Sequence, residues 1–435
     1  MPLIGTLTTS RITKSSPLGD DFTVLGVLEV ARKKASNETT VHDGFFSTQL
    51  QQRDRENKDK VVLGLPLQAI SLRYLFCNDV FPYSRMTELV GVSESCKTAF
   101  LFEIYRWHIF NTTELKAYNP EELHGGFIHN LVEPRDSPDL RESIIRVGNY
   151  SNRYPVVQSN CVEDWQKSCS DWIKRAEEVY SEPGSMPIPV ALGLDSLTAV
   201  TTRDEMDKTW DKGYAEPGFS QIAKSINMWA KVFFNKMSPW PVSFIGVNHL
   251  KENKAPNGAI NRSVPGGASI KFASTFMFRL SKKDDIETLD ESGRIIEIAT
   301  EKNSLSPGNH PKLKVRMVWT MDKDTGEQNT VWDWHDASIE LLTSFEATRK
   351  KRIMEIVQIE NVDKARRTAD CSSLGLKKVS WSELGQAIMQ DSEIVAGLDS
   401  FLAVRKRHVF ELGVPYNEQL QNVIVDSTGE DDIDA

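Results

Sequence analysis

The stretch GVSESCKT, residues 91–98, follows the phosphate-loop pattern G-x-x-x-x-G-K-[ST], except that Cys96 stands in place of the second glycine. In such a loop, backbone N–H groups point into one concavity, a lysine reaches the outer phosphates and a hydroxyl ligates Mg²⁺. Cys96 occupies the tightest part of the turn, where the conformational freedom of glycine is normally needed. The match is weak by itself, so the residues on either side decide its value.

The flanking residues predict the context that a phosphate loop requires. Residues 86–90 are expected to form a strand, and the apolar residues of 100–107 recur at helical spacing. The loop should therefore join a strand to a helix, which strengthens the motif considerably.

Other segments indicate the fold class. Further strands are expected at 125–133, 188–197 and 242–249, a helix between Ile222 and Met237, and a hairpin made of 295–300 and 313–321. This alternation predicts an α/β fold with a twisted, mostly parallel sheet flanked by helices.

Four segments of different composition follow one another along the 435 residues. We expect a polar N-terminal arm for oligomerisation at 1–60, the α/β core at 61–345, a small, mainly helical C-terminal domain at 346–425 and an acidic disordered tail at 426–435. The net charge of −9 does not exclude nucleic acid, because binding depends on local basic patches.

Cysteine usage and apolar runs restrict the class of protein. The five cysteines are odd in number and show no C-x-x-C spacing, which argues against a disulfide framework and a zinc ribbon. No apolar run reaches the roughly 18 residues of a membrane span, and the first residues lack the apolar centre of a signal peptide. We therefore expect a cytoplasmic protein that makes no membrane contact.

Two acidic residues lie where an ATPase needs them. Hydrolysis requires a carboxylate at a strand end that helps to hold Mg²⁺ and a group that polarises the attacking water. Asp195 follows the apolar run of 188–194, and Glu133 closes the strand 125–133. Alone, the first would be a turn residue and the second an exposed loop carboxylate. Behind a phosphate loop they suit the two catalytic roles, so the residues by themselves predict a P-loop ATPase with a flexible basic loop.

That loop lies in a longer pattern between residues 247 and 280. Asn248 and His249 end a strand, and a stretch rich in Gly, Asn and Lys follows. The pattern G-G-x-x-x-K-F then appears, with its fixed positions at Gly266, Gly267, Lys271 and Phe272. This combination is much harder to meet by chance than the phosphate-loop motif.

The order of these motifs makes residues 60–330 resemble the RecA family of recombinases. The phosphate loop, Glu133, Asp195 and the Asn-His strand end follow one another as in that family. The chain is most similar to the phage UvsX-like branch, which has the motif I-N-H at the strand end and tolerates a residue other than glycine at the place of Cys96. The resemblance implies a RecA-like P-loop ATPase core.

The resemblance also implies that residues 91–98 bind ATP together with Mg²⁺. Lys97 would contact the β and γ phosphates, Thr98 would ligate Mg²⁺ and Asp195 would orient the water shell of the metal. The other loop positions implied to hold the nucleotide are Gly91, Ser93, Glu94, Ser95 and Cys96.

Four further roles near ATP are implied by the same resemblance. Glu133 would activate the hydrolytic water, and His249 would sense the γ-phosphate and report it to the loop that follows. Lys302 would reach across a subunit interface, to which Phe272 also belongs, and act on the ATP of the neighbour. The usual second lysine of that pair aligns with Ser304.

Two loops are expected to contact DNA. The first, 201–220, contains Arg203 but is net acidic by count. The second is implied to bind DNA through Lys251, Lys254, Asn257, Asn261, Arg262 and Lys271. Basic groups neutralise phosphates while a backbone rich in Gly and Asn follows the strand, as sequence-independent single-strand binding requires.

The implied function is ATP-dependent DNA strand exchange by a helical filament on single-stranded DNA, which pairs that strand with a homologous duplex. Such a recombinase would serve homologous recombination and DNA repair with single-strand-binding and mediator proteins, a phage-infected bacterial cell being one setting. Two alternatives stay open. One is a RecA-fold hexameric DNA helicase, and the other is a non-hydrolysing DNA-binding filament protein in which Cys96 has disabled the loop.

Overall fold

The computed structural model describes most of the chain between residues 62 and 409. The described residues are 62–113, 129–131, 161–180, 190–197, 200–212, 219–237, 240–254, 260–263, 270–271, 273–288, 291–321 and 328–409. They all belong to one compact unit, Val61–Ala435. None of the described helices is both long enough and apolar enough to cross a membrane. The predicted arm, the acidic tail, Glu133, Asn257 and Phe272 lie outside the described residues.

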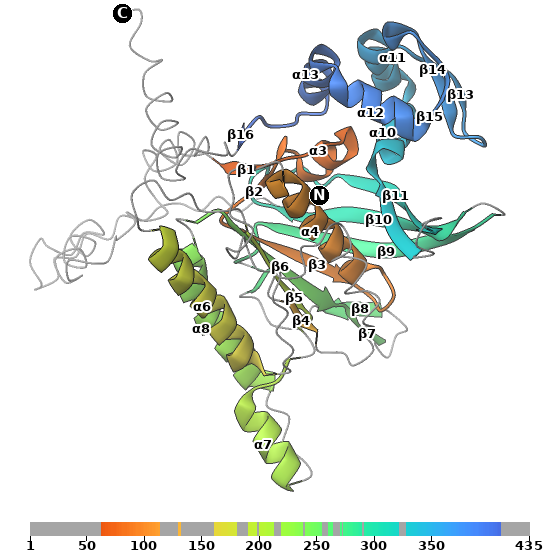
Figure 1. Ribbon diagram of the computed structural model, residues 1–435. Coiled ribbons are helices and arrows are strands. Elements are labelled where there is room, and N and C mark those ends of the chain that lie inside the picture. The colour runs from red at the N-terminus through yellow and green to blue at the C-terminus, as the bar shows by residue number, and fades with distance from the viewer. Residues whose placement is uncertain are drawn as a thin grey trace, which may run out of the picture. The chain divides into compact units, whose positions relative to one another are not determined.

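An eight-stranded sheet forms the centre, in the order β12-β11-β10-β9-β3-β6-β5-β4 (Figure 1). Its strands are β3 (Arg85–Gly91), β4 (His129–Leu131), β5 (Val190–Asp195), β6 (Val242–His249), β9 (Phe276–Glu287), β10 (Ser292–Asn303), β11 (Lys312–Met321) and β12 (Gln328–Asp333). The strands from β9 to β4 run parallel, whereas those from β9 to β12 pair antiparallel.

The α/β class is confirmed, but the expected mostly parallel sheet is a mixed one. Strands β9 to β12 follow one another along the chain and across the sheet, and such direct hairpin connections produce antiparallel pairs. One of these hairpins, β10 with β11, is the predicted one, and Glu297 lies opposite Lys314 in it.

Different helices cover the two faces of the sheet. Because neighbouring residues of a strand point to opposite faces, Ile245 of β6 joins one hydrophobic cluster and Phe244 joins another. The first cluster includes residues of α4 (Lys97–Thr113), and the second includes residues of α6 (Val162–Tyr180) and α8 (Phe219–Met237). Residues 91–98, the predicted phosphate loop, therefore continue directly into the helix that packs on the first face.

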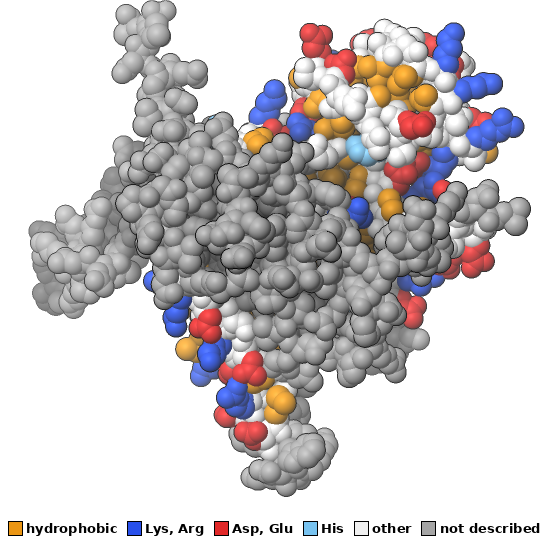
Figure 2. All heavy atoms as spheres, in the orientation of Figure 1, with side chains coloured by type: hydrophobic (Ala, Val, Ile, Leu, Met, Phe, Trp, Pro, Cys, Tyr) orange, Lys and Arg blue, Asp and Glu red, His pale blue; other side chains and the backbone are white. Residues whose placement is uncertain are grey.

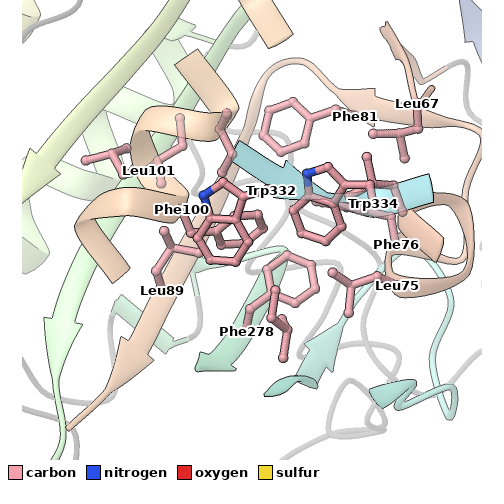
Figure 3. Close-up of a cluster of buried hydrophobic side chains, with 14 of the residues drawn as sticks. Leu67, Leu75, Phe76, Phe81, Leu89, Phe100, Leu101, Phe278, Trp332 and Trp334 are labelled. Carbon is pink, nitrogen blue, oxygen red and sulfur yellow. The ribbon is translucent and has the colours of Figure 1, made fainter. Parts of the chain in front are cut away.

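Several aromatic rings pack together in the cluster to which α4 contributes (Figure 3). The ring centroid of Phe100 lies 5.5 Å from that of Trp332 and 5.6 Å from that of Trp334, and the two tryptophans stack on each other. Trp334 is the first residue of α10 (Trp334–Ser344). Truncating one such buried aromatic ring to alanine typically costs about 3–5 kcal/mol, so these rings fix α10 firmly against α4.

After α10 the chain forms a smaller region with its own hydrophobic cluster, which we call the C-terminal region. Its elements are α11 (Ala347–Val357), β13 (Ile359–Asp363), β14 (Thr368–Cys371), β15 (Leu376–Ser380), α12 (Trp381–Gln390) and α13 (Ser392–Phe401). The expected helices are thus accompanied by a three-stranded antiparallel sheet, β13-β14-β15.

A second small sheet joins the end of the described chain to its beginning. β16 (His408–Val409) pairs in parallel with β1 (Leu63–Pro66), which pairs antiparallel with β2 (Val80–Pro82). Between β1 and β2 lies α3 (Ile70–Phe76), whose Arg73 forms an ion pair with Asp399 of α13. The C-terminal region is therefore attached to the central part by both backbone pairing and charge.

Candidate nucleotide site

Three parallel strands end at one edge of the sheet with residues that the sequence singles out. β3 ends at Gly91, β5 at Asp195 and β6 at His249, and Gly91 pairs with His249 across the ladder. From β3 the chain goes on to β4 on one side, whereas from β6 it goes on to β9 on the other side of β3. Ligands of α/β sheets bind at the carboxyl ends of strands where connections diverge in this way.

The backbone of the loop has the tight course that its motif predicts. A Cβ atom on Gly91 would lie 2.3 Å from Ser95 Oγ and 2.6 Å from the Leu280 carbonyl oxygen, so only glycine fits there. Glu94 and Cys96 have φ angles of 63° and 62°, in the left-handed region. Cys96 thus adopts the conformation for which the motif uses glycine, at a cost of about 1 kcal/mol or more.

The lysine of the motif bends back over the loop. Its Nζ donates to the Val92 carbonyl at 2.7 Å and lies 3.3 Å from Ser95 Oγ. Lys97 is also the first residue of α4 and is buried. Its ammonium group therefore lies inside the curve of the loop, where the phosphates of a nucleotide would meet it.

Thr98 and Asp195, the two residues expected to handle Mg²⁺, lie together. The Thr98 hydroxyl donates to the carboxylate of Asp195, which joins the loop to the end of β5. Among the described residues, no three His, Cys, Asp or Glu side chains gather into a metal-binding group. The Thr98–Asp195 pair consists of oxygen donors, and Mg²⁺ is commonly held by one or two protein oxygens while phosphates and water complete its octahedron.

His249 lies beside the loop at the end of β6. It is half-buried, and the Leu250 N–H after it donates to the Gly91 carbonyl at 2.9 Å. The preceding Asn248 is fully buried and accepts the His249 N–H through Oδ1 at 3.0 Å. The residue that follows the predicted sensor is therefore hydrogen-bonded to the predicted phosphate loop, and His249 itself is the ladder neighbour of Gly91.

Glu88 in β3 is a further polar residue of this edge that the motifs did not reveal. It is fully buried, accepts from Asn248 and lies within hydrogen-bonding distance of Ser274. Burial raises the pKa of Glu88, and both hydrogen bonds together with the charges of Lys302 and Lys271 oppose that effect. The sequence carries one signal for it, since a glutamate interrupts the otherwise apolar strand 86–90.

Arg294 of β10 also reaches the loop, and no local sequence signal indicates it. Its Nη1 atom lies 3.5 Å from the Glu94 carbonyl oxygen and 3.7 Å from Cys96 Sγ, and its guanidinium carbon lies 5.5 Å from the ring centroid of Trp319. Burial raises the pKa of the Cys96 thiol, which the hydrogen bond and charge of Arg294 oppose. The outer side of the loop thus faces a cation from a distant strand.

Lys302, expected to act on a neighbour's ATP, contacts its own chain in the structure. Its Nζ donates to the Lys271 carbonyl at 2.6 Å. Burial lowers the pKa of Lys302, and the carboxylate of Glu88 opposes that effect. Lys302 therefore anchors the end of the second candidate DNA loop.

Those of the expected DNA-binding residues that the structure describes lie in regular structure, and Asn257 is outside the described residues. Arg203 begins α7 (Arg203–Lys212), and its guanidinium forms an ion pair with Asp164 of α6. Figure 2 shows basic and acidic side chains interleaved over α6 and α7. In the second loop, β7 (Lys251–Lys254) and β8 (Ile260–Ser263) pair antiparallel, with Glu252 opposite Arg262. These described residues form a ribbon, where a flexible irregular stretch was expected, because the backbone N–H and C=O groups of two polar segments can pair with each other.

Comparison with protein-family models gives no match for this chain, and a search of curated proteins finds no similar sequence. The chemistry of this sheet edge therefore has to be inferred from its geometry. That geometry joins a phosphate-loop backbone, a threonine–aspartate pair and a polar strand end, all within the described residues.

Proposed function

We propose that the chain is an ATP-dependent DNA strand-exchange recombinase that assembles into helical filaments on single-stranded DNA. The observation that supports this best is the hydrogen bond from Leu250 N–H to the Gly91 carbonyl, at 2.9 Å. Leu250 is followed directly by β7, so the proposed nucleotide loop touches the root of the ribbon that carries Lys251, Lys254 and Arg262.

ATP would bind with its phosphates in the curve of residues 91–98. The loop N–H groups, the positive end of the α4 dipole and Lys97 would hold the phosphate oxygens. Bound between Thr98, Asp195 and the phosphates, Mg²⁺ would neutralise charge that develops during phosphoryl transfer. Glu133 stays our candidate for orienting the attacking water.

Nucleotide would control DNA binding through His249. A γ-phosphate beside the ends of β3 and β6 would order the ribbon, whose lysines and arginine would neutralise DNA phosphates. Hydrolysis would release this order and the strand. Lys302 and Phe272 are proposed to lie at a head-to-tail contact between subunits, and such contacts give a filament when they do not close into a ring.

Cys96 favours one second candidate, a DNA-binding filament protein that does not hydrolyse ATP. A left-handed residue other than glycine is strained, and relaxation of Cys96 would displace the N–H groups that hold a phosphate. The two candidates differ in a single measurable property, which is turnover of ATP.

The test is ATP hydrolysis with and without single-stranded DNA, followed by electron microscopy of the same mixture. We expect DNA to stimulate turnover by about tenfold or more and Lys97→Ala to reduce it by about a hundredfold or more. We also expect filaments. Turnover that survives Lys97→Ala would exclude the proposed site, filaments without turnover would favour the second candidate, and closed hexamers would favour the helicase.

A further inference from the structure

Glu88 is a carboxylate enclosed at the centre of the parallel half of the sheet. It lies in β3, the strand that ends at the phosphate loop, and its side chain is 0% exposed. A carboxylate is almost never enclosed in this way unless other groups compensate for the loss of water. The groups that do so come from both ends of the segment that contains the ribbon β7–β8.

The first partner, Asn248, lies where this segment begins. Its Nδ2 donates to Glu88 Oε1 at 3.0 Å, and its Oδ1 accepts the backbone N–H of His249 at 3.0 Å. An ionised carboxylate only accepts and a backbone N–H only donates, so one orientation of the amide satisfies both. Glu88 thereby determines how Asn248 holds the backbone of His249.

The second partner, Ser274, lies where the segment rejoins the sheet. Its Oγ is 3.4 Å from Glu88 Oε2 and 2.7 Å from the Ile270 carbonyl oxygen. Lys302, whose charge acts on Glu88, donates to the carbonyl of Lys271 in the same short segment. The end of the segment is therefore tied to Glu88 by a hydrogen bond and by charge.

We infer that Glu88 is a positioning residue that couples occupation of the phosphate loop to the affinity of the ribbon β7–β8 for single-stranded DNA. Asn248 before the ribbon and Ser274 after it both contact this one side chain, and that side chain stands on the strand that carries the loop. A shift of β3 on phosphate binding moves the two anchors together. The inference rests on the proposed function, and Glu88 itself is enclosed away from nucleotide and DNA.

Three variants separate positioning from general support of the fold. Glu88→Ala removes both hydrogen bonds and leaves the Asn248 amide without this acceptor. Glu88→Gln keeps both contacts, since its oxygen accepts from Asn248 and its NH₂ group donates to Ser274 Oγ, which reverses the wild-type bond in which Ser274 donates to Glu88. Ser274→Ala removes a single oxygen atom, and with it the contact to Glu88 and the hydrogen bond to the Ile270 carbonyl, while Asn248 keeps its bond to Glu88.

Glu103 of α4 offers a matched control. It is also a buried carboxylate, 6% exposed, but it accepts from Trp107 Nε1 at 3.1 Å and from Trp334 Nε1 at 3.0 Å. Glu103→Ala therefore removes an enclosed, hydrogen-bonded carboxylate without touching either end of residues 250–273.

The measurement is the affinity of the full chain for a fluorescent oligothymidylate, with ATPγS and without nucleotide. Affinity for ATPγS and thermal unfolding are measured alongside. We expect the wild type to bind the strand about tenfold more tightly with ATPγS, and Glu88→Ala to bring that ratio close to one while its ATPγS affinity changes by less than about threefold. Ser274→Ala should give an intermediate ratio, whereas Glu88→Gln and Glu103→Ala should keep the wild-type ratio.

The outcomes separate the inference from the function on which it rests. A folded Glu88→Ala protein with the wild-type ratio overturns the inference. If Glu88→Ala does not fold, a wild-type ratio in Ser274→Ala overturns it instead, and so does an equal loss in Glu103→Ala. A wild-type protein whose strand affinity ignores ATPγS rejects the proposed function itself.

Discussion

The sheet edge around residues 91–98 and the C-terminal region both bury charged side chains, but they surround them differently. At the edge, Lys97 bonds to a carbonyl and a hydroxyl, and Glu88 bonds to an amide and a hydroxyl. Where the C-terminal region meets α3 and α10, the charges form ion pairs, Arg73 of α3 with Asp399 and Arg367 with Asp336 of α10. A direct ion pair joins two elements, whereas hydrogen bonds to neutral groups leave a charge able to respond to an arriving ligand, as Glu88 also responds to the charges of Lys302 and Lys271. The comparison separates buried charge that joins elements from buried charge that, under the proposed function, is placed to meet a ligand.

Breaking an ion pair gives the largest expected effect on stability. The side chains of Arg73 and Asp399 are 11% and 3% exposed, so Arg73→Ala leaves a buried carboxylate without its main cation. We expect this variant to lower the free energy of unfolding by about 3–5 kcal/mol in chemical denaturation, with ATPγS affinity changed by less than about twofold.

Asp399→Asn is the control for this ion pair. It should cost less, because Arg73 still has Asp79 at 4.0 Å. A tenfold loss of nucleotide affinity in Arg73→Ala would contradict this contrast between the two regions. It would show that the ion pair also supports the nucleotide site at the sheet edge.

Low pH should lower the free energy of unfolding by a second, smaller amount, through a histidine in α4. His108 of α4 is 2% exposed, and burial lowers its pKa from 6.5 to about 4. The unfolded chain therefore binds this proton at a higher pH than the folded chain, so the stabilising contribution is complete above pH 6.5 and is lost as the pH falls toward 4. We expect a loss of about 3 kcal/mol in unfolding free energy across that window.

A variant without the imidazole isolates this contribution. His335 of α10, whose pKa burial also lowers, adds to the same slope in the wild type. His108→Phe, compared with the wild type on both sides of the window, should lose most but not all of the pH dependence. If the unfolding free energy of the two proteins depends equally on pH, His108 does not cause the acid sensitivity, and His335 of α10 becomes the candidate.

Cys96→Gly should produce the smallest change in the free energy of unfolding, and it tests whether the cysteine impairs nucleotide binding. Glycine relieves the left-handed conformation, so we expect a gain of about 1 kcal/mol in unfolding free energy. ATPγS affinity, measured by calorimetry, should stay within about threefold of the wild type. Tenfold tighter binding would instead show that the cysteine has degraded the site.

The local parts of this edge were predictable because their signals lie close together in the sequence. A strand, the motif of residues 91–98 and a helix follow one another without interruption, and Asp195 and His249 each end an apolar strand. Parallel strands bring such ends together by geometry alone. The hairpin of β10 and β11 was predictable for the same reason.

Long-range partners were not predictable. Arg294 reaches Cys96 across 198 positions, and Glu88 meets Ser274 across 186, so no window of sequence contains either pair. The mixed sheet was missed because apolar periodicity identifies a strand but not its direction. Glu133 and Phe272 lie outside the described residues, and their roles stay predictions.

The parallel pairing of β16 with β1 has a mechanical consequence. Leu63 lies beside His408 and Gly64 beside Val409, so the two ends of the described chain run side by side in the same direction. A force that pulls these ends apart would slide the two strands past each other and load their hydrogen bonds together instead of one at a time. Tension along the polypeptide would therefore be resisted at this small clamp before it reached the sheet that carries residues 91–98.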